Sequence, residues 1–194
     1  MICQVFDNKF DQEYLHEILS ILEKDLSYHA NNVTNPTTWP YGKTGTHRLF
    51  GCSIFHRQSN NRIDYLDNQN APKFFDMFEF LCHLFHKNYK DVYLQRIDVN
   101  LQHSGCDGTS HLDCPPWDMD SMTVMVFPNP VWEKDWGGKF QIFSENGEDL
   151  LEEHDYVPGR LIIFPSHIPH RGLGPSEKYP YIYRHTVVFR VQPF

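Results

Sequence analysis

Residues 92–102 read Val-Tyr-Leu-Gln-Arg-Ile-Asp-Val-Asn-Leu-Gln, and apolar and polar side chains alternate along most of this stretch. Successive side chains of a β-strand point to opposite faces, so the alternation predicts a strand with one buried face. Clusters of Pro, Gly and Asn separate further β-type segments, at residues 121–127, 138–143, 159–164 and 181–190. Short strands at such spacing predict a mainly β fold, either a two-sheet jelly roll (a double-stranded β-helix) or a barrel.

Two helices are expected ahead of these strands, with a short strand at residues 2–6. Asp11 is a favourable N-cap, and leucines and isoleucines recur at helical spacing after it, which predicts an amphipathic helix over residues 12–27. Pro72 suits a first helical turn, and the apolar residues that follow have the same periodicity. Residues 30–62 are rich in Asn, Thr, Gly and Pro, which predicts a long irregular connection, either functional or a surface loop.

The length of 194 residues predicts a single domain over residues 1–194. Within this domain, residues 1–90 would provide helical support and a loop, and residues 91–194 would form the jelly-roll core.

No apolar run approaches the ~18 residues of a membrane span, and the start has no basic and apolar leader, so we expect a soluble, cytoplasmic protein. Five cysteines without a Cys-x-x-Cys pair indicate reduced thiols. The formal charge of −8 argues against nucleic-acid and membrane partners, and the oligomeric state is left open.

The segment Gly108-Thr-Ser-His-Leu-Asp113 contains the first candidate site residues. In an extended segment, His111 and Asp113 would share a face, because side chains two positions apart point the same way. An imidazole and a carboxylate are part of the 2-His-1-carboxylate triad, which holds Fe(II) and leaves coordination positions open. With 12 His in the chain such pairs also arise by chance, and a surface hydrogen bond is the alternative interpretation.

Two later segments strengthen the first interpretation. The sequence Phe164-Pro-Ser-His-Ile-Pro-His-Arg-Gly172 follows a predicted strand, and the strands of a jelly roll converge at one mouth, so either His167 or His170 could join the pair. In the last predicted strand, Arg184 and Thr186 share a face. A guanidinium and a hydroxyl there could bind one carboxylate, whereas the alternative is a surface Arg on an edge strand.

The order of these parts resembles the Fe(II)/2-oxoglutarate-dependent dioxygenases, particularly the prolyl-4-hydroxylase-like branch. The similarity covers about half of the chain and rests on an ordered series: His111-x-Asp113, Gly137-Gly138, Pro158-Gly159-Arg160, His170 and Arg184-x-Thr186. The resemblance implies that His170, which precedes Arg-Gly, is the third metal ligand, and that Arg184 and Thr186 hold the distal carboxylate of 2-oxoglutarate. Many relatives also supply a tyrosine from the strand before His-x-Asp. Here Asn100 and Gln102 occupy that region and are candidates for the same role.

The resemblance further implies a hydroxylase that uses Fe(II), 2-oxoglutarate and O2, with ascorbate as a candidate reductant. Such an enzyme converts 2-oxoglutarate to succinate and CO2 and hydroxylates an unactivated C–H bond, here of a prolyl peptide or a small amino-acid-like substrate. Asp113 favours hydroxylation, because related halogenases lack this carboxylate. Two other classes remain open: a non-catalytic jelly roll that binds a ligand, and a zinc hydrolase with the same triad but no evident second carboxylate base.

Residues near the triad invite further roles. Cys114 is the next position after Asp113 and is expected to face away from the site as a structural residue. Trp117, Trp132 and Trp136 lie in predicted loops at the mouth of the jelly roll, where they would stack on a substrate or anchor the loops.

Overall fold

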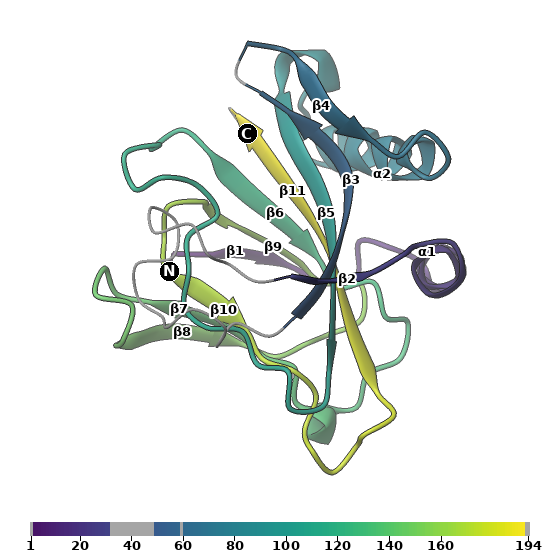
Figure 1. Cartoon of the computed structure of the whole chain (residues 1–194), viewed down its shortest axis with the longest axis vertical. Coiled ribbons are helices and arrows are strands. Elements are labelled where there is room, and N and C mark those ends of the chain that lie inside the picture. The colour runs from purple at the N-terminus through teal and green to yellow at the C-terminus, as the bar shows by residue number, and fades with distance from the viewer. Residues whose placement is uncertain (1, 32–48, 59, 193–194) are drawn as a thin grey trace.

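A computed structural model describes residues 2–31, 49–58 and 60–192 (Figure 1). These residues form a large and a small antiparallel sheet. The large sheet runs in the order β1 (Gln4–Phe6), β9 (Leu161–Pro165), β6 (Met122–Val126), β11 (Tyr183–Gln192), β5 (Tyr93–His103), β3 (Leu49–Arg57), β2 (His29–Asn31), with β4 (Ile63–Leu66) beside β3. The small sheet runs β10 (His170–Gly172), β7 (Phe140–Phe143), β8 (Leu150–His154). Short 3-10 helices η1 (Tyr89–Asp91) and η2 (Lys134–Trp136) complete the elements.

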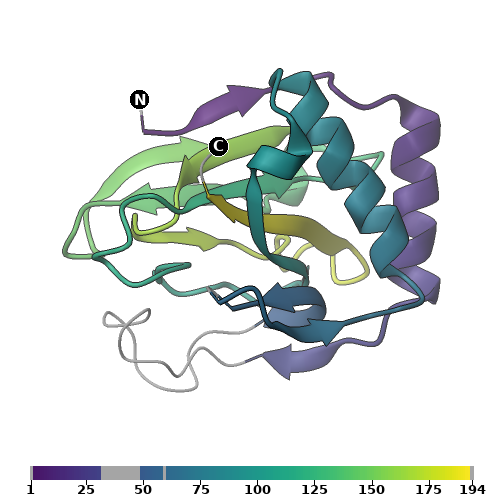
Figure 2. The same ribbon diagram turned by 90° about the horizontal axis from the view of Figure 1, so that it is seen from above.

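Two helices, α1 (Gln12–Lys24) and α2 (Ala71–Leu84), lie side by side on one face of the large sheet (Figure 2). The carboxylate of Asp11 caps α1 as predicted, since its Oδ1 accepts a hydrogen bond of 2.7 Å from the backbone N–H of Tyr14. The apolar faces of both helices pack on β5, β6, β9 and β11 and form the main core, which includes Leu22 and Phe74. Burial of these apolar side chains is the main stabilising contribution to this layer.

The other face of the large sheet looks toward the small sheet. A second apolar cluster fills part of this space and contains Phe140 of β7, Phe164 of β9 and Tyr156. The remaining part is an open cavity between the two sheets. Two facing antiparallel sheets with helices on the outer face confirm the predicted mainly β jelly roll.

The prediction of an irregular connection over residues 30–62 is wrong for residues 49–57, which form the nine-residue strand β3. A β-bulge between Ser53 and Phe55 explains the error. It leaves Ile54 and Phe55 both buried, at 0% and 1% exposure, so the period-two pattern of a strand is broken in the sequence. Residues 32–48 of the predicted connection lie outside the described residues.

Neither described helix is long and apolar enough to cross a membrane. All five cysteines lie in the described part of the chain, and none of them forms a disulfide, which agrees with the predicted reduced thiols.

Candidate metal centre and carboxylate pocket

Two backbone connections bring His170 to His111 and Asp113, although it lies far from them in the sequence. His111 follows β5, and His170 is the first residue of β10. The two histidines exchange both backbone hydrogen bonds at 3.0 Å, as an antiparallel bridge. The backbone N–H of Asp113 donates to the carbonyl of Ser166 at 2.9 Å. The segment after β5 is thereby aligned with the segment after β9.

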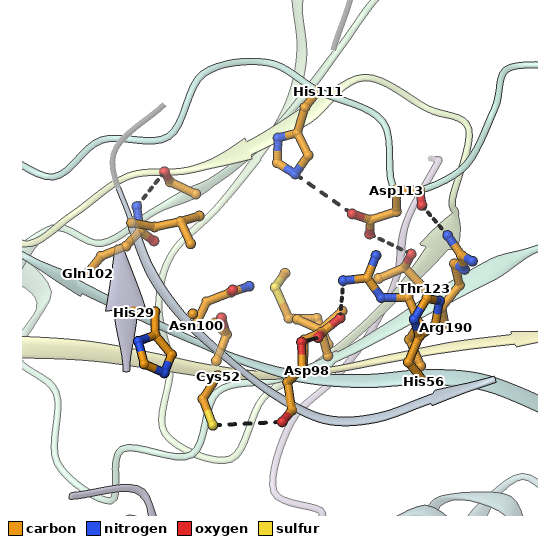
Figure 3. Close-up of a pocket in the computed structure, with 18 of the residues that line it drawn as sticks. His29, Cys52, His56, Asp98, Asn100, Gln102, His111, Asp113, Thr123 and Arg190 are labelled. Carbon is orange, nitrogen blue, oxygen red and sulfur yellow. Dashed lines mark hydrogen bonds and ion pairs between the residues drawn. The ribbon is translucent and has the colours of Figure 1, made fainter. Parts of the chain in front are cut away.

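The three side chains converge on one point of the cavity. Nε2 of His111 lies 3.7 Å from Oδ1 of Asp113, and Nε2 of His170 lies 3.5 Å from Oδ2. The potential ligand atoms of all three residues lie within 4.8 Å of one another. Figure 3 shows His111 and Asp113 directed toward each other above the cavity. Two imidazoles and one carboxylate at this spacing can hold a divalent metal ion.

Hydrogen bonds to backbone carbonyls orient the imidazole rings of His111 and His170. Nδ1 of His111 lies 3.0 Å from the carbonyl of Thr109, and Nδ1 of His170 lies 2.9 Å from the carbonyl of Ile168. A carbonyl only accepts, so each Nδ1 donates to it and each Nε2 is directed at the possible metal site, the usual arrangement of metal-binding histidines.

The carboxylate of Asp113 is oriented in a similar way. The hydroxyl of Thr123 donates to Oδ2 of Asp113 at 2.7 Å, and Oγ of Ser166 lies 2.8 Å from that hydroxyl. Burial by itself would raise the pKa of Asp113, but the two histidines and the Thr123 hydroxyl outweigh it and hold the pKa well below its usual value. Asp113 is therefore ionised and held in place. The sequence pattern did not single out Thr123 or Ser166, because neither belongs to a motif.

A buried guanidinium also lines this cavity. Arg184 of β11 is 2% exposed; its Nε donates to the carbonyl of Gly138 at 2.9 Å, and its Nη1 donates to Oε1 of Gln102 at 2.8 Å. Its Nη2 is buried and has no hydrogen-bond partner among the described residues. Burial lowers the pKa of Arg184 to about 10, so the group is still charged at neutral pH. A buried cation with an unused donor is costly unless an anion binds to it.

Comparison with known proteins identifies this architecture. No protein-family model and no curated protein matches the sequence. Among solved structures, a 2OG-Fe(II) oxygenase family oxidoreductase from Burkholderia pseudomallei is similar over 98% of this chain and 85% of its own, at a TM-score of 0.67 and 14% identity. The chain has the fold of the 2OG-Fe(II) oxygenases.

Two further structures with this oxygenase fold are similar. A prolyl hydroxylase from Trichoplax adhaerens, in complex with a peptide fragment of hypoxia inducible factor, matches 98% of this chain and 83% of its own, at a TM-score of 0.64 and 16% identity. The viral collagen prolyl hydroxylase of Paramecium Bursaria Chlorella virus-1, as a 2OG complex, matches 100% of this chain and 97% of its own, at a TM-score of 0.59 and 12% identity.

Two glycines of the oxygenase fold make room for the guanidinium. A Cβ at Gly138, whose φ is +75°, would lie 2.7 Å from the Trp132 ring and 3.2 Å from Cδ of Arg184. A Cβ at Gly172 would lie 2.9 Å from Oε1 of Gln102 and 3.1 Å from Nη1 of Arg184. Close approach of Trp132 and Arg184 thus explains Gly138 of the diglycine motif.

Thr186, Asn100 and Gln102 lie beside Arg184 on the cavity wall. Thr186 is 1% exposed and is paired with Asn100 across β11 and β5, and both line the cavity. The side-chain amide of Gln102 is committed to the protein, because its Nε2 donates to the carbonyls of Cys106 at 2.7 Å and Gly172 at 3.0 Å. Gln102 therefore positions Arg184 through its Oε1.

His167 does not join the other three residues. It does not line the cavity, and its buried Nδ1 has no hydrogen-bond partner among the described residues. Cys114 is fully buried outside the triad, and its thiol donates to the carbonyl of Asp118 at 3.5 Å. Of the two competing histidines, the oxygenase fold brings only His170 to the triad.

Two of the three loop tryptophans are anchors. Trp132 packs on Tyr156 with ring centroids 4.2 Å apart, and its Nε1 donates to the carbonyl of Gly137 at 3.0 Å. Trp136 packs edge-on against Trp132. Trp117, in contrast, is 73% exposed. Of these three tryptophans, Trp117 is the one whose side chain is mostly exposed and open to another molecule.

Proposed function

We propose that the protein is an Fe(II)- and 2-oxoglutarate-dependent dioxygenase that hydroxylates an unactivated C–H bond. The observation that carries the proposal is the buried Nη2 of Arg184, which has no partner among the described residues and belongs to the cavity that contains the triad. A metal centre alone, as in a zinc hydrolase, does not need a buried guanidinium. A metal centre that also binds a dicarboxylate does, because the distal carboxylate needs a cation.

The donor set fits Fe(II). His111, Asp113 and His170 would hold the ion and leave coordination positions open, which is the arrangement of non-haem Fe(II) oxygenases. When bound, iron with 2-oxoglutarate and O2 supplies the oxidising chemistry, in which 2-oxoglutarate loses CO2 to become succinate and the substrate C–H bond is hydroxylated. Ascorbate would serve as a reductant.

The chain's own residues bind, orient and exclude water. Arg184 would bind the distal carboxylate of 2-oxoglutarate with the Thr186 hydroxyl beside it, and Asn100 would complete this end of the wall. Gln102 and Gly138 fix the position of the guanidinium. Thr123 keeps the Asp113 carboxylate in one orientation, so that its charge faces the metal.

Two substrate classes fit this proposal: a prolyl peptide and a small amino-acid-like molecule. The similar structure from Trichoplax adhaerens is a peptide complex of a prolyl hydroxylase, which supports the first class. The cavity of about 1130 Å³ supports either class, since it exceeds the ~300–1,000 Å³ of usual ligand pockets. It therefore has room for 2-oxoglutarate and part of a second molecule.

The test is anaerobic addition of Fe(II) and 2-oxoglutarate to the purified protein. We expect a weak visible charge-transfer band from the metal to 2-oxoglutarate, which disappears in Asp113→Ala and persists in the control Asp120→Ala, at an exposed carboxylate. The band should also disappear in His170→Ala and persist in His167→Ala. Absence of the band in folded wild-type protein would overturn the proposal in favour of a binding module or a zinc enzyme.

A further inference from the structure

A ladder of mostly polar residues crosses the floor of the cavity. Strands β11 and β5 pair antiparallel, and every second residue of each strand lines the cavity. The opposed pairs are Arg184–Gln102, Thr186–Asn100, Val188–Asp98 and Arg190–Arg96. Figure 3 shows Gln102 at one end and Arg190 at the other, with Asn100 and Asp98 between them. Arg184 and Arg190 are six positions apart, which is roughly 20 Å along a strand. The cavity therefore has two arginine ends.

The guanidinium of Arg190 is held in place by neutral groups. Its Nε donates to Oε1 of Gln95 at 2.5 Å, and its Nη1 donates to the backbone carbonyl of Asp113 at 2.6 Å. These bonds use two of the five N–H donors of a guanidinium. None of the ion pairs found among the described residues involves Arg190. Arg190 is thus fixed by its neighbours and keeps donors for another group.

The carboxylates near Arg190 have other partners among the described residues. Arg96, opposite it on β5, binds Asp98 through Nη2 and Oδ2 at 2.6 Å, and Asp98 also accepts from the Ser53 hydroxyl at 2.8 Å. Burial lowers the pKa of His56, and Arg96 lowers it further, so this imidazole is neutral. The carboxylates of Asp98, Asp113 and Asp118 all lie near this end. Asp98 is paired with Arg96, and Asp118 accepts hydrogen bonds from Ser121 and Gln192, so neither forms an ion pair with Arg190. The carboxylate of Asp113 is close, but its charge belongs to the triad.

We propose that Arg190 binds a carboxylate of the substrate, so that the enzyme acts on an acidic substrate and not on a neutral prolyl segment. This inference rests on the proposed function, in which Arg184 binds 2-oxoglutarate and the triad holds the metal. Arg190 lines the cavity, is fixed by Gln95 and the Asp113 carbonyl, and forms none of the ion pairs found among the described residues. The planar fork of Arg190 matches a carboxylate better than it matches an amide.

The carboxylate has two possible sources, a free amino acid or an acidic group on a peptide. Two matched probe pairs separate them: L-proline with L-prolinamide, and acetyl-Asp-Ala-Pro-amide with acetyl-Asn-Ala-Pro-amide. The full chain, labelled with ¹⁵N, is loaded with Zn(II) and saturated with 2-oxoglutarate. The side-chain Nε–H signal of Arg190, assigned by its loss in Arg190→Lys, is followed during titration with each probe.

We expect the Arg190 signal to shift saturably with one carboxylate probe and not with its amide partner. The pair that responds identifies the source. Arg190→Gln should weaken calorimetric binding of that probe about tenfold or more, because a charge-assisted bond is lost. The control Arg62→Gln, which removes an exposed ion pair with Asp64, should leave the binding unchanged.

An Arg190 signal that responds to neither carboxylate, or equally to both amides, would overturn the inference. Circular dichroism verifies that each variant is folded. The anaerobic charge-transfer band with Fe(II) and 2-oxoglutarate distinguishes a failure of the proposed function from a failure of the substrate assignment. If wild-type protein lacks the band, the proposed function fails. If the band is present and the Arg190 signal does not shift with either carboxylate probe, only the substrate assignment fails.

Discussion

Gly138→Ala tests whether the carboxylate pocket depends on the close approach of backbone and guanidinium. The φ of Gly138 is +75°, and a Cβ there would lie 2.7 Å from Cζ2 of Trp132 and 3.2 Å from Cδ of Arg184. A non-glycine residue at positive φ costs about 1–2 kcal/mol, and overpacking of a filled site adds about 1–3 kcal/mol. We therefore expect the free energy of unfolding to fall by about 2–5 kcal/mol.

Gly105→Ala is the matched control for the backbone contribution. Its φ is +74°, and the nearest atom to a Cβ there is Oε1 of Glu177 at 3.9 Å, an ordinary contact. This variant should lose only about 1–2 kcal/mol. Urea unfolding, followed by tryptophan fluorescence, measures both variants, and the anaerobic band measures their affinity for 2-oxoglutarate. Gly138→Ala should also bind 2-oxoglutarate more weakly, because Arg184 has to move. Equal losses of stability in both variants, with unchanged affinity, would refute the reasoning.

Three further predictions concern the site and its strand. Arg184→Gln should weaken 2-oxoglutarate binding about tenfold to a hundredfold, as measured by titration of the anaerobic band; an unchanged affinity would remove Arg184 from the site. Thr123→Val should lower metal affinity about 10- to 100-fold in a chelator competition, since it removes a hydrogen bond to Asp113, and equal competition curves would contradict this role. Burial, assisted by Arg184, lowers the pKa of His185 to about 4, from about 6.5 in the unfolded chain. The unfolded state then binds more protons between these pH values, so stability should fall by about 2 kcal/mol from pH 7 to pH 5. In His185→Gln this part of the loss should vanish in urea unfolding, and an unaltered pH dependence would show that His185 is not its source.

Local sequence patterns were sufficient to predict a strand or helix whose side-chain periodicity is regular. The alternation in residues 92–102 predicted β5, and Asp11 with the leucine spacing predicted α1, although the helix ends at Lys24 instead of residue 27. The same rule failed for β3, because its bulge places two consecutive side chains in the core.

The choice between His167 and His170 shows where sequence reasoning stops. Both histidines follow the same strand, three positions apart, and only the resemblance to a family favoured the second. In the structure, the backbone bridge between His111 and His170 aligns the second histidine with the triad. No property of residues 164–172 by themselves encodes that alignment.

The sequence by itself determined the class of fold, the His-x-Asp pair and the shared face of Arg184 and Thr186, because strand and helix periodicities are local. Only the tertiary structure decided that Gln102 holds Arg184 and that Arg190 is paired with Arg96 on neighbouring strands of the cavity floor. These contacts join strands that are distant in the chain, and their partners depend on the register of strand pairing. A shift of one residue in that register would turn every second side chain away from the cavity, so the site exists only in the assembled sheet.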